Sequence, residues 1–170
     1  MKLLFSYTGP LIVDADGNYY SRTISDHVLA RYFRIASNVT MLTRLKKVTD
    51  DNVIRRLMKI ESQGFSVRQC PNLSSLTGMI FNKKQAKRII EQAVKEADVV
   101  ISRLPCFIGN LVINEAVRQR KPYLIELVGC PWDSMWNHSI KGKFIAPSAY
   151  YATKKRVKNA KYVVYVTNEF

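Results

Sequence analysis

The sequence predicts a doubly wound α/β fold, in which helices cover both faces of a mainly parallel sheet of about six strands. Short apolar runs with strand composition alternate along the chain with segments whose apolar residues recur at helical spacing. Most predicted strands are continuous apolar runs, which is typical of strands buried on both faces of a parallel sheet. Because crossovers between parallel strands are right-handed, this pattern indicates a Rossmann-like domain.

The length and composition suit one domain over residues 1–170. A chain of 170 residues lies within the usual size range of a single domain. Apolar residues make up 47% of the chain, which is enough for a substantial core and too many for a disordered protein.

Six segments have the β-branched and aromatic composition of buried strands. They are residues 2–7, 38–45, 65–70, 98–104, 122–129 and 162–167. Between the first strand and the first helix, residues 8–23 are rich in Gly, Asp and Tyr, so we expect a long polar loop there.

Five segments show helical periodicity. They are residues 25–37, 49–64, 82–97, 106–121 and 146–160. Ser25 and Asn82 are the expected N-caps of the first and third helices. We expect Gly64 to end the second helix, and Pro147 to lie in the first turn of the last one.

The protein is expected to be strongly basic, because 27 lysines and arginines against 13 acidic residues give a net charge of +14. Such a surface attracts polyanions, either nucleic acid or the anionic cytoplasmic leaflet of a membrane. No apolar run approaches the roughly 20 residues that span a bilayer. The opening MKLLFSY is too short for a secretory signal. We therefore expect a cytoplasmic protein.

Neither the cysteines nor the acidic residues indicate a metal site. Cys70, Cys106 and Cys130 are odd in number and lack C-x-x-C spacing, so we expect free thiols. Residues 14–21 (DADGNYYS) look like half of a calcium loop, but the glutamate that should follow is missing. We expect no metal and no cofactor in this domain.

Ligands of doubly wound sheets bind beyond the carboxyl ends of the strands, which directs attention to the loops at that edge. These loops contain Thr8, Gly9, Pro10, Arg103, Gly129, Cys130, Asp133 and Asn168. The first loop has no G-x-G-x-x-G motif, and Pro10 removes an amide that would face a phosphate. No Walker A sequence occurs either, so the usual means of holding NAD or ATP are absent from the sequence.

The last predicted helix has a basic, aromatic face. At about 100° per residue, one arc holds Tyr150, Tyr151, Lys154, Lys155 and Lys158. Small apolar residues, such as Ala149 and Val157, occupy the opposite arc. This distribution is typical of a helix that rests on a membrane, where each Lys near an anionic leaflet contributes roughly 1 kcal/mol. A merely solvated basic face is the alternative.

Four sequence segments occur together in a characteristic order. They are SRLP (102–105), KPYLIELVGCPWD (121–133), HSIKGKFIAP (138–147) and AKYVVYVTNEF (160–170). With this order and spacing the chain resembles the N-terminal domain of bacterial retaining glycosyltransferases of the B fold. The similarity is greatest to enzymes of capsule and exopolysaccharide assembly, and it is best over residues 98–170.

The resemblance implies one half of a two-domain enzyme that is peripherally associated with the inner membrane. This half would bind a saccharide or lipid-linked saccharide acceptor, and nucleic acid would not be a partner. The family's C-terminal domain binds the nucleotide-sugar donor through a Glu-x7-Glu segment. The retaining members transfer the sugar without a metal ion, so the N-terminal domain supplies positioning instead of a strong general base.

Carried over by position, Thr8, Gly9 and Pro10 would approach the donor phosphates and the acceptor. Arg103 would contact an acceptor or its phosphate, with pairing to Glu126 or Glu169 as the alternative. Residues 129–133 would lie near the transferred sugar. Relatives place a polar residue in that stretch where this chain has Cys130, which leaves Asp133 as the candidate for a sugar hydroxyl contact or for capping a turn. Asn168 would mark the edge of the cleft.

No Glu-x7-Glu pair occurs in these 170 residues. Val99, Leu104, Tyr123 and Ser134, for example, stand eight positions after Glu91, Glu96, Glu115 and Glu126. We therefore expect the donor-binding domain to lie beyond the chain given, and this part alone to be inactive. Two other functions stay open. One is a complete nucleic-acid-binding module, although no RNA-binding signature occurs. The other is a flavodoxin-like enzyme or regulator that binds a phosphate at the strand edge.

Overall fold

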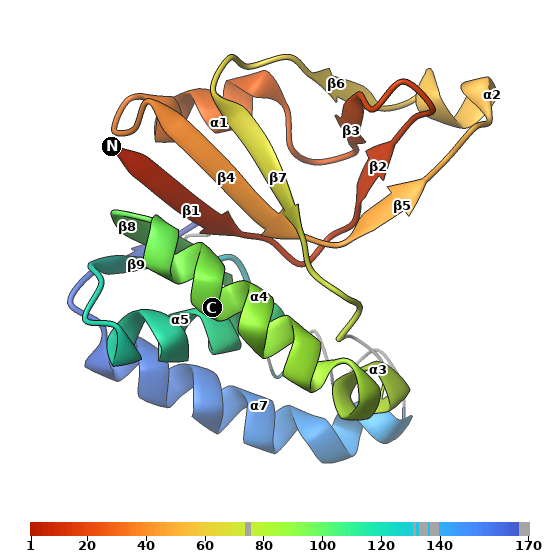
Figure 1. The fold of residues 1–170 in the computed structure, drawn as a ribbon. Coiled ribbons are helices and arrows are strands. Elements are labelled where there is room, and N and C mark those ends of the chain that lie inside the picture. Colours follow the sequence, from red (N-terminus) through yellow and green to blue (C-terminus); the bar gives the residue numbers. More distant parts are fainter. Residues whose placement is uncertain (74–75, 131, 133–135, 137–139, 167–170) are drawn as a thin grey trace.

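Six parallel strands form the central sheet of the computed structural model, which describes residues 1–73, 76–130, 132, 136 and 140–166 (Figure 1). Their order is β10-β9-β8-β1-β4-β7, and every neighbouring pair is parallel. The strands are β1 (Lys2–Ser6), β4 (Asn38–Thr43), β7 (Phe65–Gln69), β8 (Val99–Leu104), β9 (Tyr123–Leu127) and β10 (Val163–Tyr165). This is the Rossmann strand order, with its switch point between β1 and β8, and it confirms the predicted fold class.

The side chains of the central strands alternate between two hydrophobic clusters, one on each face of the sheet. Leu4 and Val100 pack against α4 (Lys83–Glu96) and α5 (Phe107–Arg118). Leu3 and Phe5 pack on the other face against α1 (Asp26–Phe33). The long α7 (Ile140–Asn159) lies on the same side as α4 and α5 (Figure 1). The short α3 (Leu76–Phe81) precedes α4.

A second sheet of four short strands, in the order β5-β2-β3-β6, extends from the carboxyl ends of β1 and β4 (Figure 1). It contains β2 (Leu11–Val13), β3 (Tyr19–Ser21), β5 (Leu45–Lys47) and β6 (Met58–Ile60). The prediction of a polar loop over residues 8–23 was therefore wrong. The two strands in that stretch form an antiparallel hairpin, with Ile12 opposite Tyr20.

The helix predicted over residues 49–64 was also wrong, because only the single turn α2 (Asp51–Ile54) is helical there. The residues that follow form β6, which pairs antiparallel with β3 and places Ile60 in the core with 7% of its surface exposed. Burial of one side chain against the hairpin overrides the weak helical preference of this segment. Gly64, predicted to end a helix, has a positive φ of 79° in the turn before β7.

The β2–β3 hairpin turn is organised by one carboxylate, that of Asp14. It accepts hydrogen bonds from the backbone nitrogen of Asn18 (2.8 Å), from its side-chain amide (2.9 Å) and from the Tyr20 hydroxyl (2.9 Å). These bonds, chiefly the one from the Asn18 side chain, lower the pKa of Asp14. Gly17 supplies the left-handed conformation that the turn needs, with φ of 84°. The DADG sequence thus functions as a turn.

Three helix boundaries test these predictions. Asn82 stands at the N-cap of α4 as predicted, but its side chain makes no capping hydrogen bond. Ser25 caps α1 as predicted, with its hydroxyl accepting from the backbone nitrogen of Val28 at 3.4 Å. The last helix instead begins at Ile140, so Pro147 lies inside α7 and the prediction of a first-turn proline was wrong. Because proline has no N–H, α7 forgoes one helical hydrogen bond at this position.

The switch point is closed by contacts between β1, β8 and α5. The hydroxyls of Ser6 and Ser102 lie 2.7 Å apart, and Ser102 also donates to the carbonyl of Gly109 at 3.1 Å. A β-carbon added to Gly109 would lie 2.8 Å from the Arg103 carbonyl, the Cys106 sulfur and the Ser102 hydroxyl. Only glycine lets α5 pack this closely against β8.

We predict that Gly109→Ala lowers the free energy of unfolding by about 1–3 kcal/mol, because the new methyl group overpacks this contact. Gly129→Ala is the matched control, since an added β-carbon there meets no atom within 4 Å, and its effect should stay within about 0.5 kcal/mol. Urea unfolding of both variants measures the difference. Equal stability of the two variants would show that the helix–strand contact is loose.

Candidate functional site

The candidate site is the carboxyl edge of the parallel sheet, around the switch point between β1 and β8. The loops that follow β1, β8 and β9 leave the sheet side by side, because these strands are neighbours and run in the same direction. Thr8, Arg103 and Gly129 therefore meet at one edge, as the sequence predicted. Whether they bind a substrate stays a prediction.

The loop after β1 is held by side chains from the end of β4. The hydroxyl of Thr43 donates to the carbonyl of Gly9 at 2.5 Å. Arg44 donates from Nε and Nη2 to the carbonyl of Thr8, at 3.2 and 3.0 Å. The third contact of the same guanidinium is to Oδ1 of Asn72, at 3.1 Å. One arginine thus ties the loops that follow β1 and β7 together.

Sequence reasoning missed Arg44. The predicted strand ran through residue 45, so this position counted as strand interior instead of edge. The signal that could have found it is the polar pair Thr43 and Arg44 at the end of an apolar run. Residues of that kind at the carboxyl end of a parallel strand belong to the edge where ligands bind.

A buried carboxylate, that of Glu126 on β9, organises the face of the site next to α1. Only 5% of the residue is exposed. Arg103 donates to it from Nε and Nη2, both at 3.1 Å, and Arg31 donates at 3.2 Å. The Tyr32 hydroxyl contacts both carboxylate oxygens, at 2.8 and 3.0 Å. The structure therefore confirms the alternative in which Arg103 pairs with Glu126.

The electrostatics of this cluster leave an excess of positive charge at the edge of the sheet. Two guanidinium groups face one carboxylate, and the Tyr32 hydroxyl remains neutral because burial, followed by the charge of Glu126, raises its pKa. The Arg103 side chain is 16% exposed, whereas that of Arg31 is 43% exposed. Arg103 also lies over the rings of Phe5 and Tyr7, at 5.3 and 5.7 Å. Arg31 is therefore the more accessible cation of the pair.

The first turn of α5 brings a thiol to the switch point. Cys106 is the N-cap of this helix, and its sulfur accepts from the backbone nitrogen of Gly109 at 3.0 Å. Burial raises the pKa of the Cys106 thiol, and hydrogen bonding to Thr8 and Gly109 opposes the rise. Burial likewise raises the pKa of Cys70 to about 11. The thiols of Cys70 and Cys106 are therefore protonated and unreactive at neutral pH.

A pocket of about 330 Å³ lies between the end of β9, α7 and β10. Gly129 and Cys130 line it together with Tyr150, Lys154 and Tyr165. Two groups that the sequence placed separately, the loop after β9 and the aromatic face of the last helix, therefore meet in one hollow. Asp133 and Asn168, the remaining predicted site residues, lie outside the described residues.

Aromatic rings and lysines continue from this pocket over the surface of α7. Trp132 stacks on Trp136 with ring centroids 5.0 Å apart, and Tyr150 meets Trp132 edge-on at 6.3 Å. Lys154 lies over the Tyr150 ring at 5.7 Å. Tyr151, Lys154, Lys155 and Lys158 are exposed and Tyr150 is half-buried, which agrees with the predicted outer arc. The two tryptophans were not foreseen as part of this surface.

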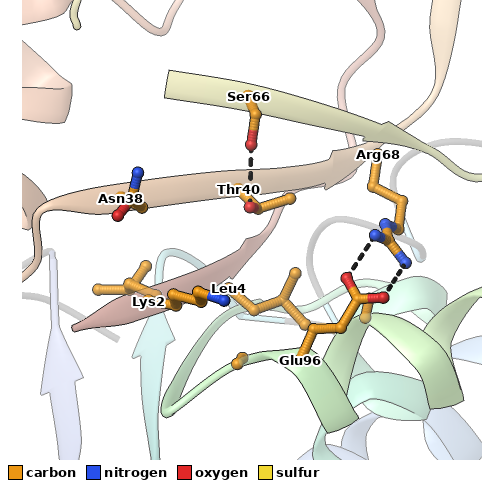
Figure 2. Close-up of a pocket in the computed structure, with 10 residues that line it drawn as sticks. Lys2, Leu4, Asn38, Thr40, Ser66, Arg68 and Glu96 are labelled. Carbon is orange, nitrogen blue, oxygen red and sulfur yellow. Dashed lines mark hydrogen bonds and ion pairs between the residues drawn. The ribbon is translucent and has the colours of Figure 1, made fainter. Parts of the chain in front are cut away.

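The polar groove in Figure 2 lies near the opposite edge of the sheet, where β1 and β4 begin. Four of its polar side chains form two pairs. Thr40 and Ser66 share a hydrogen bond of 2.9 Å, and Arg68 forms an ion pair with Glu96 at 2.5 Å. Because these groups already have partners and lie away from the carboxyl edge, the groove is a weaker candidate for a ligand site.

Comparison with known proteins gives one informative similarity. The chain is 30% identical over 171 residues to Protein CapJ of Staphylococcus aureus, a match that covers 100% of this chain and 43% of CapJ. It thus spans less than half the length of this relative. No family model matches the sequence, and no solved structure matches it. Within the described residues, no helix is long and apolar enough to cross a membrane.

We predict that Glu126→Ala lowers the free energy of unfolding by about 3–5 kcal/mol, because two arginines and a tyrosine lose their buried partner. Glu61→Ala is the control. Glu61 pairs with Lys59 at the surface, where both side chains are well exposed, and its loss should cost less than about 1 kcal/mol. Urea unfolding compares the two variants. Similar losses in both would contradict the structural role of Glu126.

Proposed function

We propose that this chain is the acceptor-binding part of a glycosyltransferase that acts in capsular polysaccharide synthesis. The enzyme transfers a sugar from a nucleotide-sugar to a saccharide acceptor that is free or lipid-linked. The observation that carries the proposal is the similarity to CapJ, a capsule biosynthesis protein, along the whole chain. The more specific proposal, that the protein transfers a sugar, rests on the resemblance to B-fold enzymes and on the carboxyl edge of the sheet.

Three features support a domain that binds the acceptor and does not bind the nucleotide-sugar. The strand order is that of a Rossmann domain, yet the loop after β1 lacks the glycines that would cradle a pyrophosphate. That loop is instead fixed by Thr43 and Arg44, which suits a positioning role. CapJ is more than twice as long as this chain, which leaves room for a donor-binding domain in that relative.

In this proposal the residues of the chain position the acceptor and provide electrostatic stabilisation. The loop of Thr8 to Pro10 forms one wall of the site, and Gly129 and Cys130 form another. Arg31 and Arg103 give the edge a positive potential that attracts a phosphate-bearing acceptor. Correct placement of the reacting hydroxyl is the main contribution that such a domain makes to the rate.

We further propose that the outer face of α7 contacts an anionic membrane. Tyr151, Lys154, Lys155 and Lys158 are all exposed on α7. Trp136, which is 39% exposed, adds an aromatic ring of the kind that favours the membrane interface. Contact through this face would bring the pocket beside Cys130 close to lipid-linked acceptors.

The test measures sugar transfer by membranes from a capsule-producing strain. In this strain the gene for the protein is deleted and replaced by a gene for the intact protein or for one of its variants. The membranes receive a panel of radiolabelled UDP-, GDP- and dTDP-linked sugars, and incorporation into lipid-linked saccharide is measured. We predict that Arg44→Gln lowers incorporation at least about tenfold, because the Thr8 loop loses its anchor and small displacements of reacting groups are costly.

Arg55→Gln is the control for the loss of one positive charge, since Arg55 is exposed at the end of α2. Its incorporation should stay within about twofold of the wild type, as expected for a surface substitution. Membranes that lack the gene yet incorporate every sugar at the wild-type level would refute sugar transfer by this protein. Equal activity of the two variants would refute the role of the Thr8 loop.

A further inference from the structure

A second pocket of about 420 Å³ lies between α5 and α7, away from the carboxyl edge. It is lined by Asn114 from α5, Tyr123 at the start of β9, and Lys155, Arg156 and Asn159 from α7. Because Tyr123 begins its strand, the pocket lies at the edge of the sheet opposite to Gly129. It is therefore separate from the candidate site described above.

Arg156 in this pocket has unused hydrogen-bonding capacity. Its Nη1 donates to the carbonyl of Ala152 in the same helix at 2.8 Å. Its Nε is buried without a partner and closed to solvent, so a ligand in the pocket would bind the guanidinium through Nη1 and Nη2. Among the described residues no carboxylate lies within ion-pair distance of it. Burial also lowers the pKa of its guanidinium.

Two other half-buried arginines pair with carboxylates, and a third, Arg44, donates instead to the Thr8 carbonyl and to Oδ1 of Asn72. Arg103 pairs with Glu126 at 3.1 Å, and Arg68 pairs with Glu96 at 2.5 Å. A partly buried charge without a partner costs free energy that such pairs avoid. Arg156 has fewer partners than these three arginines, and an external anion at its outer nitrogens would supply one.

The side chains around Arg156 are chemically suited to an anion. Asn114 and Asn159 offer amide donors, Tyr123 offers a hydroxyl and Lys155 offers an ammonium group. The carboxyl end of α7 carries about half a negative charge, which opposes an anion. Lys155, Arg156 and Lys158 in its last turns outweigh that partial charge.

We propose that this pocket binds a phosphate group, as a monoester or diester. The lining offers several donors for the oxygens of a phosphate, and the guanidinium fork suits its geometry. Lys155 belongs both to the pocket and to the exposed face of α7. The headgroup of an anionic phospholipid could therefore reach the pocket from a membrane in contact with α7, and a soluble phosphate ester could enter from water.

The phosphate site is independent of sugar transfer, and failure of the proposed enzyme activity would leave it unaffected. Only the possibility that a membrane phospholipid supplies the phosphate depends on the proposed membrane contact of α7. The decisive variant is Arg156→Lys, which keeps the positive charge and removes the guanidinium fork. Its control is Arg88→Lys, the same substitution at an exposed position of α4.

In the first arm, the intact protein is sedimented with vesicles of phosphatidylcholine containing phosphatidylglycerol, and separately with phosphatidylcholine alone. A charge-assisted guanidinium–phosphate contact corresponds to roughly tenfold or more in affinity. We predict that Arg156→Lys weakens binding to the phosphatidylglycerol vesicles about tenfold, whereas Arg88→Lys changes it less than about twofold. General attraction to the surface is the same in both variants, so the difference reports the pocket.

In the second arm, glycerol 1-phosphate is titrated into the protein and the NMR signals of the Asn114 and Asn159 side-chain amides are followed. Shifts of these signals that Arg156→Lys abolishes and Arg88→Lys retains would support the site with a soluble ester as ligand. Loss of binding in the vesicle arm alone would identify a lipid headgroup. If Arg156→Lys behaves like Arg88→Lys in both arms while thermal unfolding shows both variants folded, the proposal is overturned.

Discussion

The buried carboxylate of Glu126 is the constraint on which the candidate site depends. A negative charge with 5% exposure is tolerated only when partners surround it, and here they come from β8 and α1. The same interaction fixes Arg103 over the rings of Phe5 and Tyr7, directly before the loop that begins at Thr8. Strand pairing, helix packing and the charge of the carboxyl edge are therefore linked through one residue.

The central sheet could be predicted because its signals are local. Continuous apolar runs mark β1, β8 and β9, and the burial of Ala86, Ile90 and Val94 follows the helical periodicity that predicted α4. The second sheet could not be predicted in this way. Its strands have three residues each, and they are stabilised by pairing between segments far apart in sequence, such as Tyr20 with Lys59. A single-turn helix beside them carries a misleading helical signal.

The site was predictable to the extent that it follows from topology. Thr8, Arg103, Gly129 and Cys130 lie at the carboxyl edge because parallel strands end there, and that much needs only the strand positions. The partners of these residues depend on three-dimensional contacts. Arg44 fixes Thr8 from a neighbouring strand, and Arg31 reaches Glu126 from a helix 95 positions earlier in the chain. No sequence spacing encodes either contact.

The central claim is that the acceptor binds at the carboxyl edge of the sheet. Hydrogen exchange of the intact protein tests it most directly, measured with and without the lipid-linked saccharide that accepts sugar in the transfer assay. Bound acceptor should slow amide exchange in residues 7–11, which contain the Thr8 loop, and in residues 128–130 at the pocket beside Cys130. Protection confined to residues 38–40 and 66–68, which border the groove of Figure 2, would contradict the account.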